Sequence, residues 1–279
     1  MTESIVSVGT TEAREAVDRP SSGDALACYV YAVVPAEAAG LEDFHPLGLD
    51  GCPVRVVVQG RIGALVHDCS ARPYESGGEA AEASWVLAHH AVLQRAMATC
   101  GSVLPMTFNT IVAATDGRTA DETLRDWLAV EHGSLKSRVD AMAGKAEFGL
   151  QVSYTPEAIL RRVTDEVPEV KRLEGEARTA SAGRAYLTRQ QLERVVRREL
   201  EQRVADLFTA IYEGTRACCV SVTVEKVKHA ENDERMLANL SCLVARDRYP
   251  EIEALAEELG REDGQSVRLV GPLPPYSFC

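Results

Sequence analysis

The fold of this chain depends most on Thr155–Gly214, a charged stretch that reads TPEAILRRVTDEVPEVKRLEGEARTASAGRAYLTRQQLERVVRRELEQRVADLFTAIYEG. From Leu192 to Tyr212 its apolar residues recur at steps of three and four, so they fall on one stripe of an α-helix. The stripe comprises Leu192, Val195, Val196, Leu200, Val204, Leu207, Phe208, Ile211 and Tyr212. Arginine and glutamate dominate the other face. The pattern predicts a long amphipathic helix.

Two shorter helices are predicted ahead of the long one, over Glu157–Val163 and Glu169–Thr179. Pro168 separates them, because proline lacks the backbone N–H and clashes with the preceding turn. Gly183 is expected to mark a further break before the long helix. The apolar stripe suits a helix that lies on a sheet, and it also suits a projecting coiled-coil arm. Both arrangements remain open at this point.

The chain before this stretch is predicted to alternate strands and helices. Gly60 lies between two strands and predicts a tight hairpin turn. Pro105 indicates an edge position, a bulge or a strand that starts just after it. Thr119 and Glu122 have the spacing of a capping box at the start of a helix. The expected strands are Ala25–Val34, Pro53–Gln59, Arg61–Asp68 and a strand-like run over Val103–Val112, and the expected helices are Glu79–Thr99 and Thr119–Ala143. In the first helix, the apolar residues expected to point mostly inward are Ala80, Ala83, Val86, Leu87, Val92, Leu93 and Met97.

The chain around and after this charged stretch is also predicted to combine strands and helices. Strands are expected at Glu147–Tyr154, Ala217–Lys228, Met236–Arg246 and Gln265–Val270, with a helix at Tyr249–Gly260. The order predicts an α+β fold of two ferredoxin-like α/β sandwich domains, in which a loop replaces the first helix of the first domain and a long helical, coiled-coil-like insertion extends the second. The expected parts are a disordered leader over 1–24, an N-terminal domain over 25–143, and a C-terminal domain over 144–279 that includes the arm 155–214 and a proline-rich tail 271–279.

The composition excludes several classes of protein. The 279 residues include 42 acidic and 30 basic side chains, a net charge of −12, whereas nucleic-acid binding requires a concentrated basic surface. No apolar run approaches the ~20 residues that span a bilayer, and the first residues lack a signal-peptide pattern. We therefore expect a cytoplasmic protein. The eight cysteines contain no C-x-x-C pair, so we expect reduced, structural thiols.

Signatures of catalysis are missing from the sequence. A P-loop, a G-x-G-x-x-G, a G-x-S-x-G and an H-E-x-x-H are all absent. The nearest approach to a metal-binding group is His67, Cys69, His89 and His90, which we interpret as ordinary surface or half-buried side chains. Cys218 and Cys219 are expected to face opposite sides of a strand. The sequence thus predicts a protein that is not an enzyme and holds no cofactor or metal.

Two proline-containing segments stand out instead, VLPMTF at Val103–Phe108 and GPLPPYSF at Gly271–Phe278. Proline pre-orders the chain in an extended form, so such a tail can pack along a surface at small entropic cost. It can strap its own domain or serve as a docking peptide. The candidate protein-interaction residues are Pro105, Met106, Phe108, Pro274, Pro275, Tyr276 and Phe278.

Five segments together resemble one known family. They are YVYAVV (29–34), VLPMTF (103–108), GKAEFGLQV (144–152), GRAYLTRQQ (183–191) and GPLPPYSF (271–278), in order across nearly the whole chain. On these segments the chain resembles the gas vesicle protein F/L family. Thr107 and Leu273 depart from the family pattern, in which a basic residue and a tryptophan are common at these positions.

The resemblance implies an accessory protein of gas vesicle assembly. Such a protein would bind the small hydrophobic shell protein and other gas vesicle proteins, in the cytoplasm or on the vesicle, and we favour the N-terminal domain as the contact surface, through an open sheet edge near Pro105 or through the sheet face. Two rival hypotheses remain. One is a small-ligand or sensory protein built on paired ferredoxin-like domains, and the other is a ferredoxin-like enzyme of the monooxygenase or haem type, for which only His67 and its neighbours offer candidates.

Overall fold

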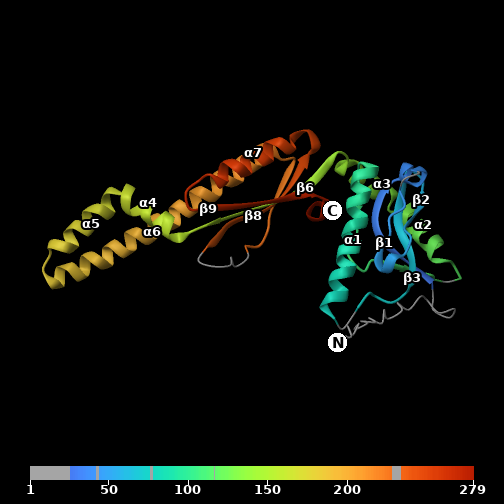
Figure 1. The fold of residues 1–279 in the computed structure, drawn as a ribbon, viewed down its shortest axis with the longest axis horizontal. Coiled ribbons are helices and arrows are strands. Elements are labelled where there is room, and N and C mark those ends of the chain that lie inside the picture. Colours follow the sequence, from blue (N-terminus) through green and yellow to red (C-terminus); the bar gives the residue numbers. More distant parts are fainter. Residues whose placement is uncertain (1–25, 42–43, 76–77, 116, 228–233) are drawn as a thin grey trace, which may run out of the picture.

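The computed structural model describes residues 26–41, 44–75, 78–115, 117–227 and 234–279. The predicted leader, 1–24, lies outside these residues. The described chain forms two units that lie side by side, each built on an antiparallel sheet, and a helical arm extends from the second unit away from the first (Figure 1). We refer to residues 26–142 as the N-terminal unit and to residues 145–279 as the C-terminal unit.

The first sheet is built around β1 (Leu26–Pro35). It pairs with β3 (Ile62–Ser70) on one side and with β4 (Leu104–Pro105) and β5 (Ile111–Ala113) on the other. At the far edge β2 (Arg55–Gln59) pairs with β3 through the Gly60 hairpin, so the order is β2-β3-β1-β4. Nearly every residue of β1 is apolar and buried on both faces of the sheet, as a central strand requires.

Helices cover both faces of this sheet. Two short 3₁₀ turns, η1 (Ala36–Gly40) and η2 (Leu49–Gly51), pack with α1 (Glu79–Cys100) on one face. The other face is covered by α2 (Ala120–Val130) and α3 (His132–Met142). The predicted capping box at the start of α2 is confirmed, with reciprocal bonds between Thr119 and Glu122. The single helix predicted over Thr119–Ala143 is wrong, because the backbone leaves helical geometry at Glu131 and divides it in two.

Two further predictions for this unit need correction. The run Val103–Val112 is not one strand: a turn in which Asn109 adopts a left-handed conformation (φ 67°) separates β4 from β5. In α1, the residues Val86 and Leu87, predicted to point inward, are 53% and 67% exposed, while Val92 and Leu93 are buried as predicted. The first half of α1 therefore presents apolar side chains to its surroundings.

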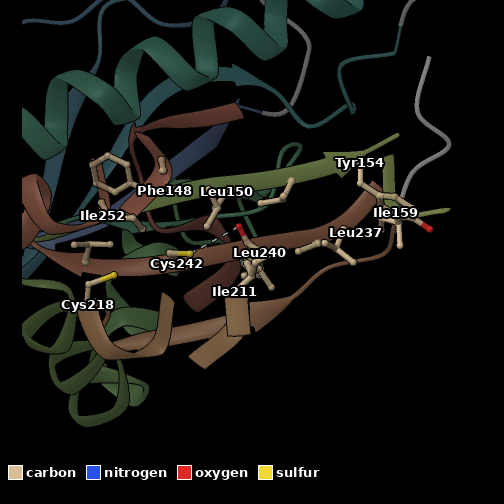
Figure 2. Close-up of a cluster of buried hydrophobic side chains, with 14 of the residues drawn as sticks. Phe148, Leu150, Tyr154, Ile159, Ile211, Cys218, Leu237, Leu240, Cys242 and Ile252 are labelled. Carbon is tan, nitrogen blue, oxygen red and sulfur yellow. Dashed lines mark hydrogen bonds between the residues drawn. The ribbon is translucent and has the colours of Figure 1, made fainter. Parts of the chain in front are cut away.

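The second sheet has the order β7-β8-β6-β9. Its strands are β6 (Lys145–Tyr154), β7 (Ser221–Val224), β8 (Arg235–Ala245) and β9 (Gln265–Leu273). Both α7 (Tyr249–Gly260) and the C-terminal half of α6 (Ala182–Cys218) pack on one face, where Phe148, Leu150 and Leu240 join Ile211 and Ile252 in the core (Figure 2). The opposite face carries polar side chains such as Gln151, Asn239 and Ser241.

The arm is a helical hairpin. The chain runs outward through α4 (Pro156–Glu166) and α5 (Pro168–Thr179) and returns along α6 (Figure 1). The first half of the apolar stripe packs on α4 and α5, and its second half lies on the sheet, as one of the two open arrangements predicted.

Two boundaries of the arm differ from the predictions. The break before α6 falls at Ala180 and Ser181, and Gly183 lies inside the first turn of the helix. Because α6 continues to Cys218, the strand predicted over Ala217–Lys228 is shortened to Ser221–Val224. With two antiparallel sheets and helices on their faces, the chain is α+β, as predicted.

Candidate protein-interaction groove

Some of the predicted interaction residues meet at a groove beside the N-terminal unit. The groove has a volume of about 760 Å³ and lies between α1, the segment after β4, α3 and the C-terminal tail. Its lining is mostly apolar and consists of Val86, Leu87, His89, His90, Pro105, Met106, Thr107, Phe108, Trp127, Leu135, Arg138, Tyr276 and Cys279. Two segments about 170 residues apart in the sequence thus share one surface. We call it the α1–α3 groove.

Four of the seven candidate residues line this groove: Pro105, Met106, Phe108 and Tyr276. Pro274 and Pro275 of the tail are buried and do not line the groove, and Phe278 is half-buried outside the groove lining. The sequence analysis missed Val86, Leu87, Trp127 and Arg138, because their approach to the proline segment depends on how α1, α2 and α3 pack around the sheet. No local signal separates Val86 and Leu87 from Val92 and Leu93, an adjacent apolar pair of the same helix that is buried.

A buried hydrogen-bond network holds the floor of the groove. The Tyr29 hydroxyl lies 2.9 Å from Nδ1 of His89 and accepts the backbone N–H of Asn109 at 3.2 Å. His89 bonds in turn to the Met106 backbone. With the tyrosine hydroxyl as donor, His89 is neutral and its second nitrogen donates to the Met106 carbonyl. Through this network, β1 and α1 position the segment that contains Met106 and Phe108.

A parallel network lies beside it on the same face of the sheet. The Tyr31 hydroxyl accepts the Leu49 N–H and lies 2.8 Å from Nδ1 of His67, whose Nε2 lies 2.8 Å from the Tyr74 hydroxyl. Burial lowers the pKa of His67 to about 4, and burial likewise lowers that of His89 to about 4. Both histidines are therefore neutral near pH 7, and each ring is held by tyrosine.

The tail connects the two units. Its last turn, η4 (Tyr276–Phe278), packs on the polar face of the second sheet, where the buried Glu147 carboxylate accepts the Ser277 N–H at 2.7 Å and the Ser277 hydroxyl at 2.9 Å. The Tyr276 hydroxyl lies 2.7 Å from Nδ1 of His90 on α1. In Figure 1 the C-terminus accordingly lies between α1 and the second sheet. The tail is a strap between the units and one wall of the α1–α3 groove.

The structure differs from the predictions for several histidines and cysteines. His67 and His89 are buried rather than superficial, and His90 faces the tail. All eight cysteines carry free thiols. Cys218 and Cys219 do not face opposite sides of a strand: Cys218 ends α6 and the two sulfur atoms lie 3.9 Å apart.

One group of side chains in the described part of the chain has the spacing of a metal site, Cys28, Asp68 and Asp121. The Arg55 guanidinium already lies among them, at 2.5 Å from Asp68 and 2.7 Å from Asp121. Its hydrogen bonds lower the pKa of Asp121. An arginine in this position supplies the positive charge that a metal ion would bring, so these residues form an ion-pair cluster at the sheet edge.

Comparison with known proteins identifies the family. Residues 27–279 match the family model described as gas vesicle synthesis protein GvpL/GvpF. The chain belongs to the GvpL/GvpF family. Relatives carry both names: gas vesicle protein F of a Streptomyces species is 32% identical over 259 residues (91% of this chain, 99% of the relative). Gas vesicle protein L2 of Halobacterium salinarum is 28% identical over 262 residues (90% of each).

Solved structures of GvpF share the fold. The crystal structure of GvpF from an Anabaena species superimposes with a TM-score of 0.67 at 15% identity, covering 90% of this chain and 97% of the other. GvpF from Microcystis aeruginosa gives a TM-score of 0.62, also at 15% identity, over 90% of this chain and 98% of the other. The chain thus has a GvpF-like α+β fold, and its membership of the GvpL/GvpF family supports a role in gas vesicle formation. Within the described ranges, its helices are too short or too polar to cross a membrane.

Proposed function

We propose that this GvpL/GvpF protein is a non-enzymatic assembly factor that binds the small hydrophobic gas vesicle shell protein through the α1–α3 groove. The observation that carries the proposal is the exposure of Val86 and Leu87 beside Met106 and Phe108, which together form an apolar surface on an otherwise acidic chain. Exposed apolar surface of this kind is characteristic of interaction sites.

The physical role follows from the chemistry of a shell subunit. An apolar subunit aggregates in water unless a partner covers its surface or nucleates its assembly. A rigid groove, held from below by the Tyr29–His89 network, offers such a cover without ordering new structure on binding. We propose that the chain acts in this way in the cytoplasm and at the forming vesicle, together with other gas vesicle proteins.

We also propose that both units are variants of the ferredoxin-like sandwich and divide at residues 143 and 144. In each sheet the third strand in chain order lies beside the first, and the fourth flanks the first on its other side, as in a βαββαβ unit. In the N-terminal unit, η1 and η2 take the place of the first helix, and α2 with α3 adds a third layer. In the C-terminal unit, the α4–α6 arm is the coiled-coil-like insertion in the place of the first helix.

Co-expression with the shell protein tests the proposed function. The full chain is expected to move the shell protein from the insoluble to the soluble fraction and to co-purify with it. The control in the same experiment is an unrelated acidic protein of similar size, because negative net charge alone should not keep the shell protein in the soluble fraction. If the shell protein remains insoluble, or is soluble but never co-purifies, the proposed function is wrong.

A further inference from the structure

The charged side chain in the lining of the α1–α3 groove, together with the apolar ones, indicates the chemistry of its occupant. Arg138, on α3, is the one residue with a permanently charged side chain in the lining, and none of the lining residues is acidic. No ion pair or hydrogen bond of its side chain is found among the described residues. Its positive charge is therefore not compensated by an acidic side chain in the groove lining.

Arg138 also lies close to the tail side of the groove. Arg138 lines the groove together with Tyr276 and Cys279, the two residues that the tail contributes to the lining. Arginine presents a planar fork of donors that matches a carboxylate. A carboxylate on the occupant would therefore find a partner at this end, next to apolar side chains.

The shape of the groove favours a helix as the occupant. A strand cannot readily add to the nearest sheet edge, because β4 is two residues long and Pro105 has no N–H to donate. Residues from two helices form the walls, Val86 and Leu87 on α1 and Leu135 and Arg138 on α3. Val86 and Leu87 also extend the apolar surface as exposed side chains, which suits a partner with an apolar face several residues long.

We infer that the α1–α3 groove binds an amphipathic helix whose apolar face packs on Val86, Leu87, Met106 and Phe108 and whose flanking carboxylate pairs with Arg138. The inference rests on the proposed function and deepens it, since it specifies the chemistry of the segment that docks. It predicts a binding preference set by one charge on the partner, which apolar contact by itself would not produce.

Designed peptides test this inference on the full chain. Three labelled amphipathic peptides of about 18 residues, long enough for five helical turns, would share a leucine face and differ at one flanking position, which holds Glu, Gln or Lys. We expect the Glu peptide to bind about tenfold more tightly than the Gln peptide by fluorescence anisotropy, the scale of one good ion pair. The Lys peptide should bind most weakly.

Two variants locate the effect. R138Q should remove the preference for the Glu peptide, and R138E should transfer it to the Lys peptide. R189Q is the matched control, because Arg189 is an exposed arginine on α6, remote from the groove lining, and it should retain the wild-type preference.

Several results would overturn the inference. Equal affinity for the three peptides, no binding of any of them, or a preference that survives R138Q would each do so. Decanoate is tested in the same assay, and its binding without binding of the peptides would identify a small amphipathic anion as the occupant. A dimer of the full chain that dissociates in R138Q would identify a second copy of the chain as the occupant. Co-purification of the shell protein is scored separately, so a chain that captures it without any charge preference loses this inference and keeps the proposed function.

Discussion

At the scale of single residues, two tyrosine–histidine pairs organise the N-terminal unit. Tyr29 with His89 and Tyr31 with His67 place polar atoms in an otherwise apolar layer, and each pair is bonded to backbone from a neighbouring loop. Buried polar groups are costly unless their hydrogen bonds are made, so these pairs favour one arrangement of the loops. The conformation of the groove floor therefore depends on a few side chains of β1, β3 and α1.

These pairs predict a dependence of stability on pH. A histidine with a folded pKa of about 4 and an unfolded value near 6.5 binds more protons when unfolded, so its contribution to stability is present above about pH 6.5 and is lost as the pH falls toward 4. The loss should amount to roughly 3 kcal/mol for each histidine. Urea unfolding of the full chain between pH 7 and 4.5 should show the decline.

The variant H89Q isolates one of the two contributions. It should be less stable than the wild type at pH 7, because the Tyr29 bond is lost, and its stability should fall less steeply with acid. H90Q is the control, since His90 faces the tail and lies outside the network. A slope of stability against pH that is the same in H89Q and the wild type would contradict this assignment.

At the scale of secondary structure, the arm is held by a narrow apolar seam. Val170 and Leu173 of α5 are fully buried against α6, where Val195 faces them. Ion pairs such as Arg203 with Glu166 lie on the exposed surface of the arm and contribute little. The seam continues into the core of the sheet, but α5 itself packs mainly on α6, so the end of the arm should be able to open without unfolding the sheet.

L173A tests whether the arm opens independently. Removing a fully buried leucine costs about 2–5 kcal/mol, and amide exchange should accelerate in α5 and in the first half of α6. The control L187A, at an exposed position of the same arm, should change exchange very little. Equal acceleration in β6 and β8 would show instead that the arm and the sheet unfold as one unit.

The elements themselves differ in how far the sequence predicts them. The stripe from Leu192 to Tyr212 predicts α6 correctly, because its period is local information. The end of α6 is not predictable in the same way, since Ala217–Val224 is as apolar as a strand, whereas in the structure the helix continues to Cys218 and packs on β8. Likewise, VLPMTF is recognisable as unusual, but its neighbours Leu87 and Arg138 reach it only through the tertiary fold.

At the scale of the whole molecule, the tail couples the units. It bonds to Glu147 in the second sheet and to His90 and Gln94 on α1. It also contributes Tyr276 to the groove, so an occupant of the groove would contact both units. The strap and docking roles predicted for the tail are thus compatible in one structure.

E147A should release this strap. The carboxylate accepts two hydrogen bonds from Ser277, and bonds to a charged acceptor contribute about 1.5–3 kcal/mol each. Tail amides should therefore exchange faster, and a protease should remove the tail more readily. E253A, on the exposed surface of α7, is the control. Unchanged protection of the tail in E147A would mean that Pro274 and Pro275 hold it without the carboxylate.

The most direct test of the account is co-purification of the shell protein with two matched variants of the full chain, L87E and L187E. Both leucines are similarly exposed, 67% on α1 and 63% on the arm, so neither change should unfold the protein. A groove-binding assembly factor predicts that L87E loses the shell protein while L187E retains it. Retention by L87E, or loss by L187E alone, would contradict the groove as the binding surface and point to the arm.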